Sequence, residues 1–249
     1  MDNIKGKTIA ITGAGRGIGY ATARALLARG ARVVIGDRDV ARLESAVASL
    51  SEAGMVSGHP LDVSDRESFA TFLDKARTDG SGHVDVLINN AGVMPIGPFV
   101  DQSEQSIRSA IEVNLYGVLT GCQLVLPEMV KRRSGHIINV ASLAGIMAVP
   151  GQVTYAGTKG TGSSRPVEPE EIAAAVVKVL DKPKTHVSVP AGIRPILTLI
   201  TMLGPRGRRW VNRRAGSDRL FLEFDVAARR PYEDRAQAAT GLLDDGSDR

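Results

Sequence analysis

The feature that most constrains the fold of this chain is a glycine-rich stretch, TGAGRGIG, at residues 12–19. It follows a short apolar run at 7–12 and precedes small and apolar residues at helical spacing at 18–28, so it lies where a strand turns into a helix. Glycines at such a turn allow the backbone to approach a pyrophosphate, and the N-terminus of the helix offers N–H groups and the positive end of its dipole. The stretch therefore predicts a strand–turn–helix unit that binds a dinucleotide.

Individual residues of this turn have distinct expected roles. Gly13 and Gly17 leave room for the pyrophosphate, and Gly19 allows the helix to pack close to the sheet. The turn residues assigned to the cofactor are Gly13, Gly15, Arg16, Gly17, Ile18 and Gly19. Glycine spacing alone is a weak signal in a chain with 27 glycines, and the alternative is a tight turn without a ligand.

The choice of cofactor depends on the residues that end the second predicted strand, at 32–36. Asp37 follows that strand, about 20 residues after the glycine turn, where a carboxylate can accept hydrogen bonds from the adenosine ribose hydroxyls. A 2′-phosphate would meet a like charge there, which favours NAD(H) over NADP(H). Arg38 and Arg16 favour the opposite choice, because a guanidinium pairs with phosphate, so NADP(H) stays open as the alternative.

Short apolar runs alternate with helical patterns along most of the chain. The predicted strands are 7–12, 32–36, 56–61, 84–89 and 136–141, and the predicted helices are 18–28, 40–50, 64–77 with Ser64 as its N-cap, two stretches within 103–133, and 168–180. This alternation predicts an α/β fold, a doubly wound parallel sheet of the Rossmann type with three α/β/α layers. We expect a Rossmann domain at residues 1–190 and a C-terminal extension at 191–249 that packs on it.

The motifs resemble those of the short-chain dehydrogenase/reductase family over about residues 5–159. The turn has that family's Thr-Gly-x-x-x-Gly-x-Gly form, and the family's Asn-Asn-Ala-Gly element occurs at 89–92, after the fourth predicted strand. The resemblance implies a nicotinamide cofactor, with Asp62 and Val63 near the adenine. The positions that it adds to the cofactor site are Asp62, Val63, Asn90, Ala91, Gly92, Tyr155 and Lys159.

The resemblance also implies a catalytic set formed by Asn114, Ser142, Tyr155 and Lys159. Tyr155 would exchange a proton with the substrate oxygen, and Lys159, one helical turn away, would favour the phenolate and bind the nicotinamide ribose. Ser142 would hold the substrate oxygen, and Asn114 would position a water that links Lys159 to solvent. Alternatively, the Tyr–Lys pair is an exposed helical pair and Ser142 is a cap. No metal site is expected.

The chain departs from the family directly after Lys159. Residues 160–166, GTGSSRP, have the composition of a loop, and VEPEEI at 167–172 resembles the segment that precedes the family's last helix. We therefore expect one strand and one helix fewer than the family norm, a difference of about 40 residues at typical element lengths. The resemblance implies a homodimer or homotetramer in which the shortened helix would form much of the contact.

Composition and the C-terminal region set expectations about location and partners. The single cysteine, Cys122, cannot form an internal disulfide, and no signal sequence is predicted, so we expect a cytoplasmic protein. We also expect no run of the ~20 apolar residues that a membrane span needs. An apolar stretch at 192–203 and arginines at 194–219 suggest either peripheral contact with anionic lipid or, more simply, an extension packed on the domain. Nucleic acid is not an expected partner.

Three functions are compatible with these patterns. The first is an NAD(H)-dependent oxidoreductase that interconverts a secondary alcohol and a ketone or aldehyde. The second is a non-catalytic nucleotide-binding protein, and the third is a peripheral membrane or interaction protein that uses the basic extension. For the first, a small apolar substrate is expected from the residues that would line its pocket, Met94, Leu143, Met147 and Val149.

Overall fold

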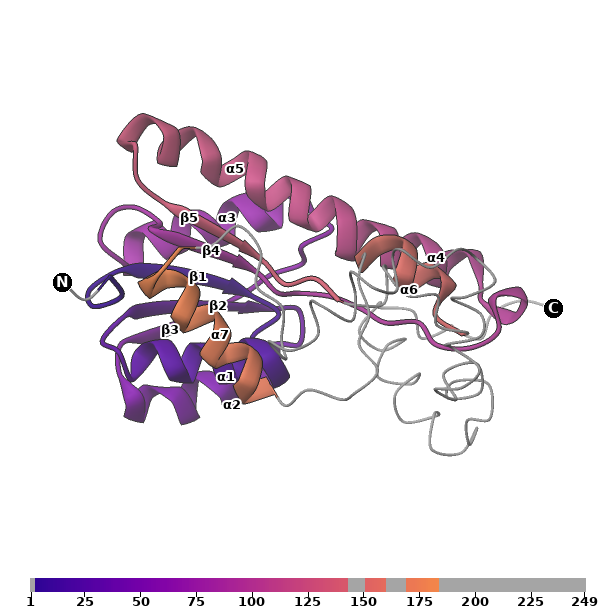
Figure 1. Cartoon of the computed structure of the whole chain (residues 1–249), viewed down its shortest axis with the longest axis horizontal. Helices are drawn as coiled ribbons and strands as arrows, with labels where there is room; N and C mark the ends of the chain where they lie inside the picture. The colour runs from indigo at the N-terminus through magenta and orange to yellow at the C-terminus, as the bar shows by residue number, and fades with distance from the viewer. Residues whose placement is uncertain (1–2, 143–150, 160–168, 184–249) are drawn as a thin grey trace.

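The computed structural model describes residues 3–142, 151–159 and 169–183, which form one parallel sheet covered by helices on both faces (Figure 1). Its strands are β1 (Thr8–Thr12), β2 (Arg32–Asp37), β3 (Val56–Pro60), β4 (Val86–Asn89) and β5 (His136–Asn139). They lie in the order β3-β2-β1-β4-β5. The chain thus builds outward from β1 to β3 and then crosses to β4 on the other side of β1, which confirms the doubly wound Rossmann arrangement.

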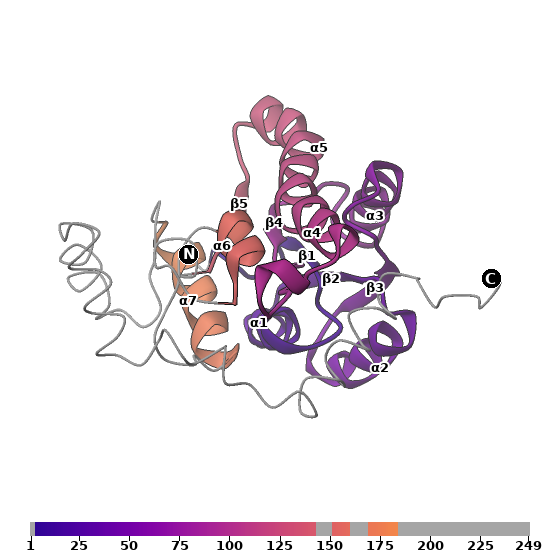
Figure 2. The ribbon, with the colours of Figure 1, turned by 90° about the vertical axis from the view of Figure 1, so that its right-hand side faces the viewer.

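Most of the helices pack on one face of the sheet or the other (Figure 2). The helices are α1 (Gly17–Leu27), α2 (Val40–Leu50), η1 (Ser51–Ala53), α3 (Arg66–Asp79), η2 (Phe99–Asp101), α4 (Glu104–Ile111), the π-helix η3 (Glu112–Tyr116), α5 (Gly117–Arg132), α6 (Val153–Lys159) and α7 (Pro169–Asp181). Helices α1, α2 and α7 cover one face, and α3 and α5 cover the other. The predicted three-layer arrangement is therefore confirmed for the described residues.

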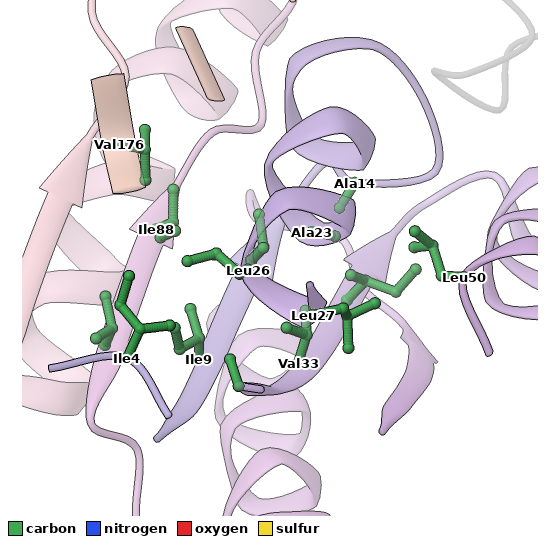
Figure 3. Close-up of a cluster of buried hydrophobic side chains, with 14 of the residues drawn as sticks. Ile4, Ile9, Ala14, Ala23, Leu26, Leu27, Val33, Leu50, Ile88 and Val176 are labelled. Carbon is green, nitrogen blue, oxygen red and sulfur yellow. The ribbon is translucent and has the colours of Figure 1, made fainter. Parts of the chain in front are cut away.

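The core consists of two clusters because side chains alternate between the faces of each strand. Ile9 and Ile11 of β1 pack against Leu26 of α1, whereas Ala10 between them faces the cluster that contains Phe72 of α3. Figure 3 shows the first cluster, in which side chains of α1 meet those of β1 and β4, with Val176 of α7 at its edge. With helices on both faces, β1 is buried along its whole length, which explains its continuous apolar pattern.

Helix α7 packs against α1 and forms ion pairs with arginines in and just after that helix. The Arg29 guanidinium donates to both carboxylate oxygens of Asp181, each at 3.1 Å, and Arg24 forms an ion pair with Glu170 at 3.6 Å. Val176 and Leu180 are buried in the cluster beneath α1. The predicted helix at 168–180 thus exists and completes one face of the sheet. The expected missing elements and the extension at 191–249, with its boundary at 190, lie outside the described residues.

One expectation about local structure is wrong. Asp65, and not Ser64, is the N-cap of α3, since the Asp65 carboxylate accepts from Glu67 N and Ser68 N. The Ser64 hydroxyl donates to Asp62 instead. The Asp62 carboxylate also accepts from the Ser64 backbone N–H two residues on, which closes an Asx turn. Elsewhere the predicted bounds of α2 match the structure, and strand ends differ by one or two residues.

The second correction concerns apolar runs. Residues 104–132 form one continuous helix that is long and apolar enough, by length and composition alone, to cross a membrane, with a mean hydropathy of 1.2 in its most apolar window. The expectation that no such run exists is therefore wrong. Val125 and Met129 on this helix belong to the core cluster that contains Phe69 and Leu87, but only 28% of the apolar window is buried.

Candidate cofactor and catalytic site

The glycine turn joins β1 to α1 in the backbone conformation that glycine permits. Gly13 and Gly17 have φ values of +65° and +59°, in the left-handed region. A Cβ on Gly13 would lie 2.7 Å from Ala91 Cα, whereas a Cβ on Gly17 would meet no described atom within 4 Å. The N-cap, Arg16, makes no side-chain hydrogen bond to the first turn of α1. A helix N-terminus that opens onto space and has no side-chain cap fits a pyrophosphate.

The segment after β4 is fastened to this turn. Asn90 Nδ2 donates to the carbonyl oxygens of Thr12 at 2.9 Å and Gly13 at 2.8 Å. In return, Thr12 Oγ1 accepts from the backbone N–H groups of Asn90 at 3.1 Å and Ala91 at 3.0 Å. Gly19 fits beneath this junction, since a Cβ there would lie 2.7 Å from Asn90 Nδ2. The structure thus brings Asn90, Ala91 and the glycines together, and it adds Thr12, a buried polar residue at a strand end that the sequence analysis did not select.

Asp37 is the last residue of β2 and lies against the glycine turn. Its Oδ2 accepts from Gly15 N at 2.9 Å and its Oδ1 accepts from Asp39 N at 3.1 Å. A Cβ on Gly15 would lie 3.0 Å from Asp37 Oδ2, so any larger residue would require the carboxylate to shift by a few tenths of an ångström. The carboxylate is therefore fixed at the edge of the turn, where the sequence predicted the ribose to bind. Ile18 next to the turn is half-buried, and Arg16 and Gly92 are exposed.

The residues expected near the adenine follow the ends of β2 and β3. Arg38 Nη1 lies 3.4 Å from Asp62 Oδ2, so these two side chains form an ion pair. The side chain of Val63 belongs to the core, where it packs beneath Gly117 of α5. If Val63 contacts a cofactor, it therefore does so through its backbone atoms.

Asn114 is buried in the π-helix η3, a conformation that often marks functional positions. Its amide Nδ2 donates to Val93 O at 2.8 Å and to Thr158 Oγ1 at 3.0 Å, and its Oδ1 accepts from Val93 N at 2.9 Å. Thr158 Oγ1 in turn donates to Tyr155 O at 3.1 Å. Asn114 thus connects the chain beyond β4 to the helix that carries Tyr155. The Lys159 side chain lies outside the described part of the chain, so the predicted water relay stays a prediction.

Helix α6, with seven residues, is held at its start as well. Gly97 N donates to Gly151 O at 2.8 Å, and Thr154 Oγ1 donates to Gln102 Oε1 at 2.6 Å. Gln152 Nε2 contacts Met94 Sδ at 3.6 Å. The chain after β4 therefore positions Tyr155 from both sides. Thr154 and Thr158 were missed by the sequence analysis, although their place on either side of Tyr155 was a signal.

Two further expectations concern the substrate side of the site. Ser142 is partly buried and follows shortly after β5, as expected. Met94 lies at the start of α6, as its contact with Gln152 shows. The other predicted wall residues lie outside the described residues; they are Leu143, Met147 and Val149.

Comparison with protein families gives a match to the family described as short chain dehydrogenase, over residues 7–164. An uncharacterized oxidoreductase of Staphylococcus saprophyticus is 42% identical over 159 residues, which are 64% of this chain and 64% of that protein. The 3-oxoacyl-acyl-carrier-protein reductase FabG of Thermotoga maritima is 39% identical over 157 residues, 63% of each chain. The matched part of this chain thus spans less than two thirds of these relatives.

Solved structures show the same fold. A metagenomic short-chain oxidoreductase in complex with NADP superposes with a TM-score of 0.66 at 30% identity, covering 72% of this chain and 92% of that one. A short chain dehydrogenase/reductase from Burkholderia phymatum in complex with NAD superposes with a TM-score of 0.73 at 22% identity, covering 81% and 95%. Proteins of this fold therefore include binders of either dinucleotide.

Proposed function

Because the chain belongs to the short-chain dehydrogenase family, we propose that it is an NAD(H)-dependent oxidoreductase that interconverts a secondary alcohol and a ketone or aldehyde. The observation that carries this proposal is the double role of the segment after β4. Asn90 fastens the glycine turn, and Val93 and Gly97 are bonded to the elements that hold α6. One stretch of chain thus sets the cofactor turn and the helix of Tyr155 relative to each other.

The proposed reaction requires a hydride and a proton to reach the two atoms of a carbonyl group. In the reducing direction the carbonyl carbon gains the hydride that NADH supplies, its oxygen gains a proton, and the products are the alcohol and NAD⁺. The Tyr155 phenol donates that proton, and Ser142 donates a hydrogen bond to the same oxygen. Lys159 compensates the charge left on the phenolate. In the oxidising direction, Tyr155 accepts the proton.

NAD(H) is the favoured cofactor because Asp37 stands at the turn where a 2′-phosphate would meet its charge. Replacing Asp37 by Ala should weaken NADH binding relative to NADPH, which fluorescence titration measures directly. A Kd ratio identical to that of the wild type would remove Asp37 from cofactor selection. For the substrate we propose a small apolar ketone, since Met94 borders α6. The relative from Thermotoga maritima is named as a reductase of a 3-oxoacyl group, which is also a ketone on an apolar chain.

The test of function is turnover by the purified chain, with NADH and a panel of apolar ketones, beside an NADH fluorescence titration. Tyr155→Phe should abolish turnover and leave NADH affinity within about twofold, because only the proton donor is lost. Tyr20→Phe is the matched control, since it removes a phenol hydroxyl that bonds Ser49 of α2. Turnover retained by Tyr155→Phe contradicts the proposed mechanism. Binding without turnover in the wild type would identify a non-catalytic nucleotide-binding protein.

The expected self-association has a candidate surface on the long helix of residues 104–132. Large apolar side chains that are 42–69% exposed recur on η3 and α5, namely Leu115, Tyr116, Leu119, Leu126 and Val130. Apolar side chains at steps of four and seven residues lie on one side of a helix. We therefore assign the contact between two copies of this chain to this surface, called the α5 stripe below.

A further inference from the structure

Two arginines follow Asp37 at the end of β2, and each pairs with a carboxylate other than Asp37. Arg38 Nη1 lies 3.4 Å from Asp62 Oδ2, and Arg42 Nε lies 2.8 Å from Asp39 Oδ2. Both pairs are partly exposed. Asp37 itself accepts backbone N–H groups. The Arg38 guanidinium, the closest in sequence to the predicted ribose position, thus already pairs with an acid that follows the neighbouring strand.

Local bonds hold the Asp62 carboxylate in this position. Its Oδ1 accepts from Ser64 N at 2.9 Å and also from the Ser64 hydroxyl. Its backbone N–H donates to Ser68 Oγ at 3.0 Å. One oxygen is therefore fixed by the turn after β3, and the other faces Arg38. Asp37 is in register with Pro60, the last residue of β3, and Asp62 follows two residues later, so the two carboxylates lie at the ends of adjacent strands.

We propose that Asp62 determines dinucleotide selectivity by holding and neutralising Arg38. A 2′-phosphate needs a cation that offsets the charge of Asp37, and Arg38 could supply a bidentate guanidinium contact if it were released. With Asp62 ionised, the two carboxylates and one guanidinium form a net negative group that repels a phosphate. Selectivity for NAD(H) is then a property of the Arg38–Asp62 pair as well as of Asp37. The proposal rests on the proposed function, because it concerns the cofactor of that reaction.

The experiment compares NADH and NADPH binding by fluorescence titration, in the wild type and in Asp62→Asn. The ratio of the NADPH Kd to the NADH Kd should fall about tenfold, since one charge beside a phosphate dianion is removed and Arg38 is released. Any contact of Asp62 with the adenine affects both dinucleotides alike and cancels in this ratio. Asp62→Ser tests the same release without an amide group, so the result does not depend on one variant.

Two matched variants separate release of Arg38 from simple loss of charge. Asp74→Asn removes a carboxylate from another aspartate–arginine pair, with Arg77 at 2.6 Å on α3, and should leave the ratio unchanged. In an Arg38→Gln background, Asp62→Asn should change the ratio less than about threefold, because no guanidinium remains to be released.

The outcomes are distinguishable. An unchanged ratio in Asp62→Asn with NADH binding intact overturns the proposal and leaves the oxidoreductase function untouched. If Asp62→Asn lowers the ratio of the NADPH Kd to the NADH Kd equally in the wild-type and the Arg38→Gln backgrounds, the proposal is also overturned. Asp62 would then act by its own charge alone. A wild-type chain that binds neither dinucleotide contradicts the proposed function and this inference together.

Discussion

Asn114 Nδ2 donates a hydrogen bond of 3.0 Å to Thr158 Oγ1, across 44 positions of sequence, and Thr158 Oγ1 in turn donates to the Tyr155 carbonyl oxygen. Helix α6 has seven residues, and isolated helices shorter than about 12 residues are marginal in water. Its geometry therefore depends on bonds to the rest of the domain. The Asn114–Thr158 bond joins it to a buried side chain that is itself bonded twice to Val93.

Thr158→Val should separate positioning from binding. The valine keeps the volume of threonine but can neither accept from Asn114 nor donate to Tyr155, so the proton donor loses its alignment. We expect kcat to fall by about 10- to 100-fold, as for a displacement of about 1 Å, with the NADH Kd unchanged. Thr78→Val, which removes a similar bond from a hydroxyl to the Asp74 carbonyl on α3, is the control. An unaltered kcat in Thr158→Val would show that this bond does not position Tyr155.

The glycine turn offers a comparison between two residues with the same strain. Gly17 and Gly6 both have positive φ, +59° and +75°, and a Cβ on either would meet no described atom within 4 Å. Alanine at each should cost about 1 kcal/mol of folding free energy, through backbone conformation alone. Only Gly17→Ala should weaken NADH binding, because its methyl group would point into the space assigned to the pyrophosphate. Thermal unfolding and NADH titration of both variants check this, and equal NADH affinities would contradict the placement of the pyrophosphate.

Asp85, just before β4, is a buried acid at the opposite end of the sheet. Burial by itself raises the pKa of its carboxyl, but the hydrogen bond from Thr8 N and the bond and charge of Lys7 outweigh it and lower the pKa below 3.8. Lys7 Nζ lies 3.1 Å from Asp85 Oδ1, and His83 and Arg132 lie at 3.3 Å and 3.8 Å from the same oxygen. The folded chain therefore prefers the ionised acid.

This shift gives stability a defined pH dependence. Because the folded-state pKa lies below the unfolded one, the contribution of Asp85 is complete above the unfolded value and is lost as the pH falls through the folded-state value. We expect Asp85→Asn to cost about 2 kcal/mol at pH 7, and this difference to shrink below about pH 4. Denaturant unfolding across this range measures it, with exposed Asp101→Asn as the control. A cost of Asp85→Asn that stays constant down to pH 3 would contradict the assigned cause.

If two copies of the chain meet at the α5 stripe, a single charged side chain placed in the stripe should disrupt the oligomer. Leu119→Glu places a carboxylate in the middle of the proposed contact, where it would be buried without a partner, and should shift the chain to monomers in light scattering. Met55→Glu changes a side chain that is 61% exposed outside the stripe and should leave the mass unaltered. A wild-type chain that is monomeric at all concentrations would contradict the assignment of this surface.

The fold could be predicted from sequence because its signals are local. Local signals predicted the strand before Gly13, the helix at 40–50 and the alternation of strands and helices. Each of these depends on neighbouring residues and on burial of one face. The N-cap of α3 was misplaced for the same reason: Ser64 and Asp65 are both good caps, and the choice depended on a bond from Ser64 to Asp62.

By itself, the sequence determined the Rossmann arrangement, the place of the glycine turn and Asp37 as a candidate, because residue type and short-range spacing decide these. Asn114 and Tyr155 were candidates through the resemblance to the family's motifs. Tertiary structure alone decided which partners these residues have. The bonds of Asn90 to the glycine turn and of Asn114 to Thr158 join segments 77 and 44 positions apart. Such pairings arise only when the parallel strands bring their carboxyl ends to one edge of the sheet, since periodicity along the chain carries no information about which distant side chains will meet there.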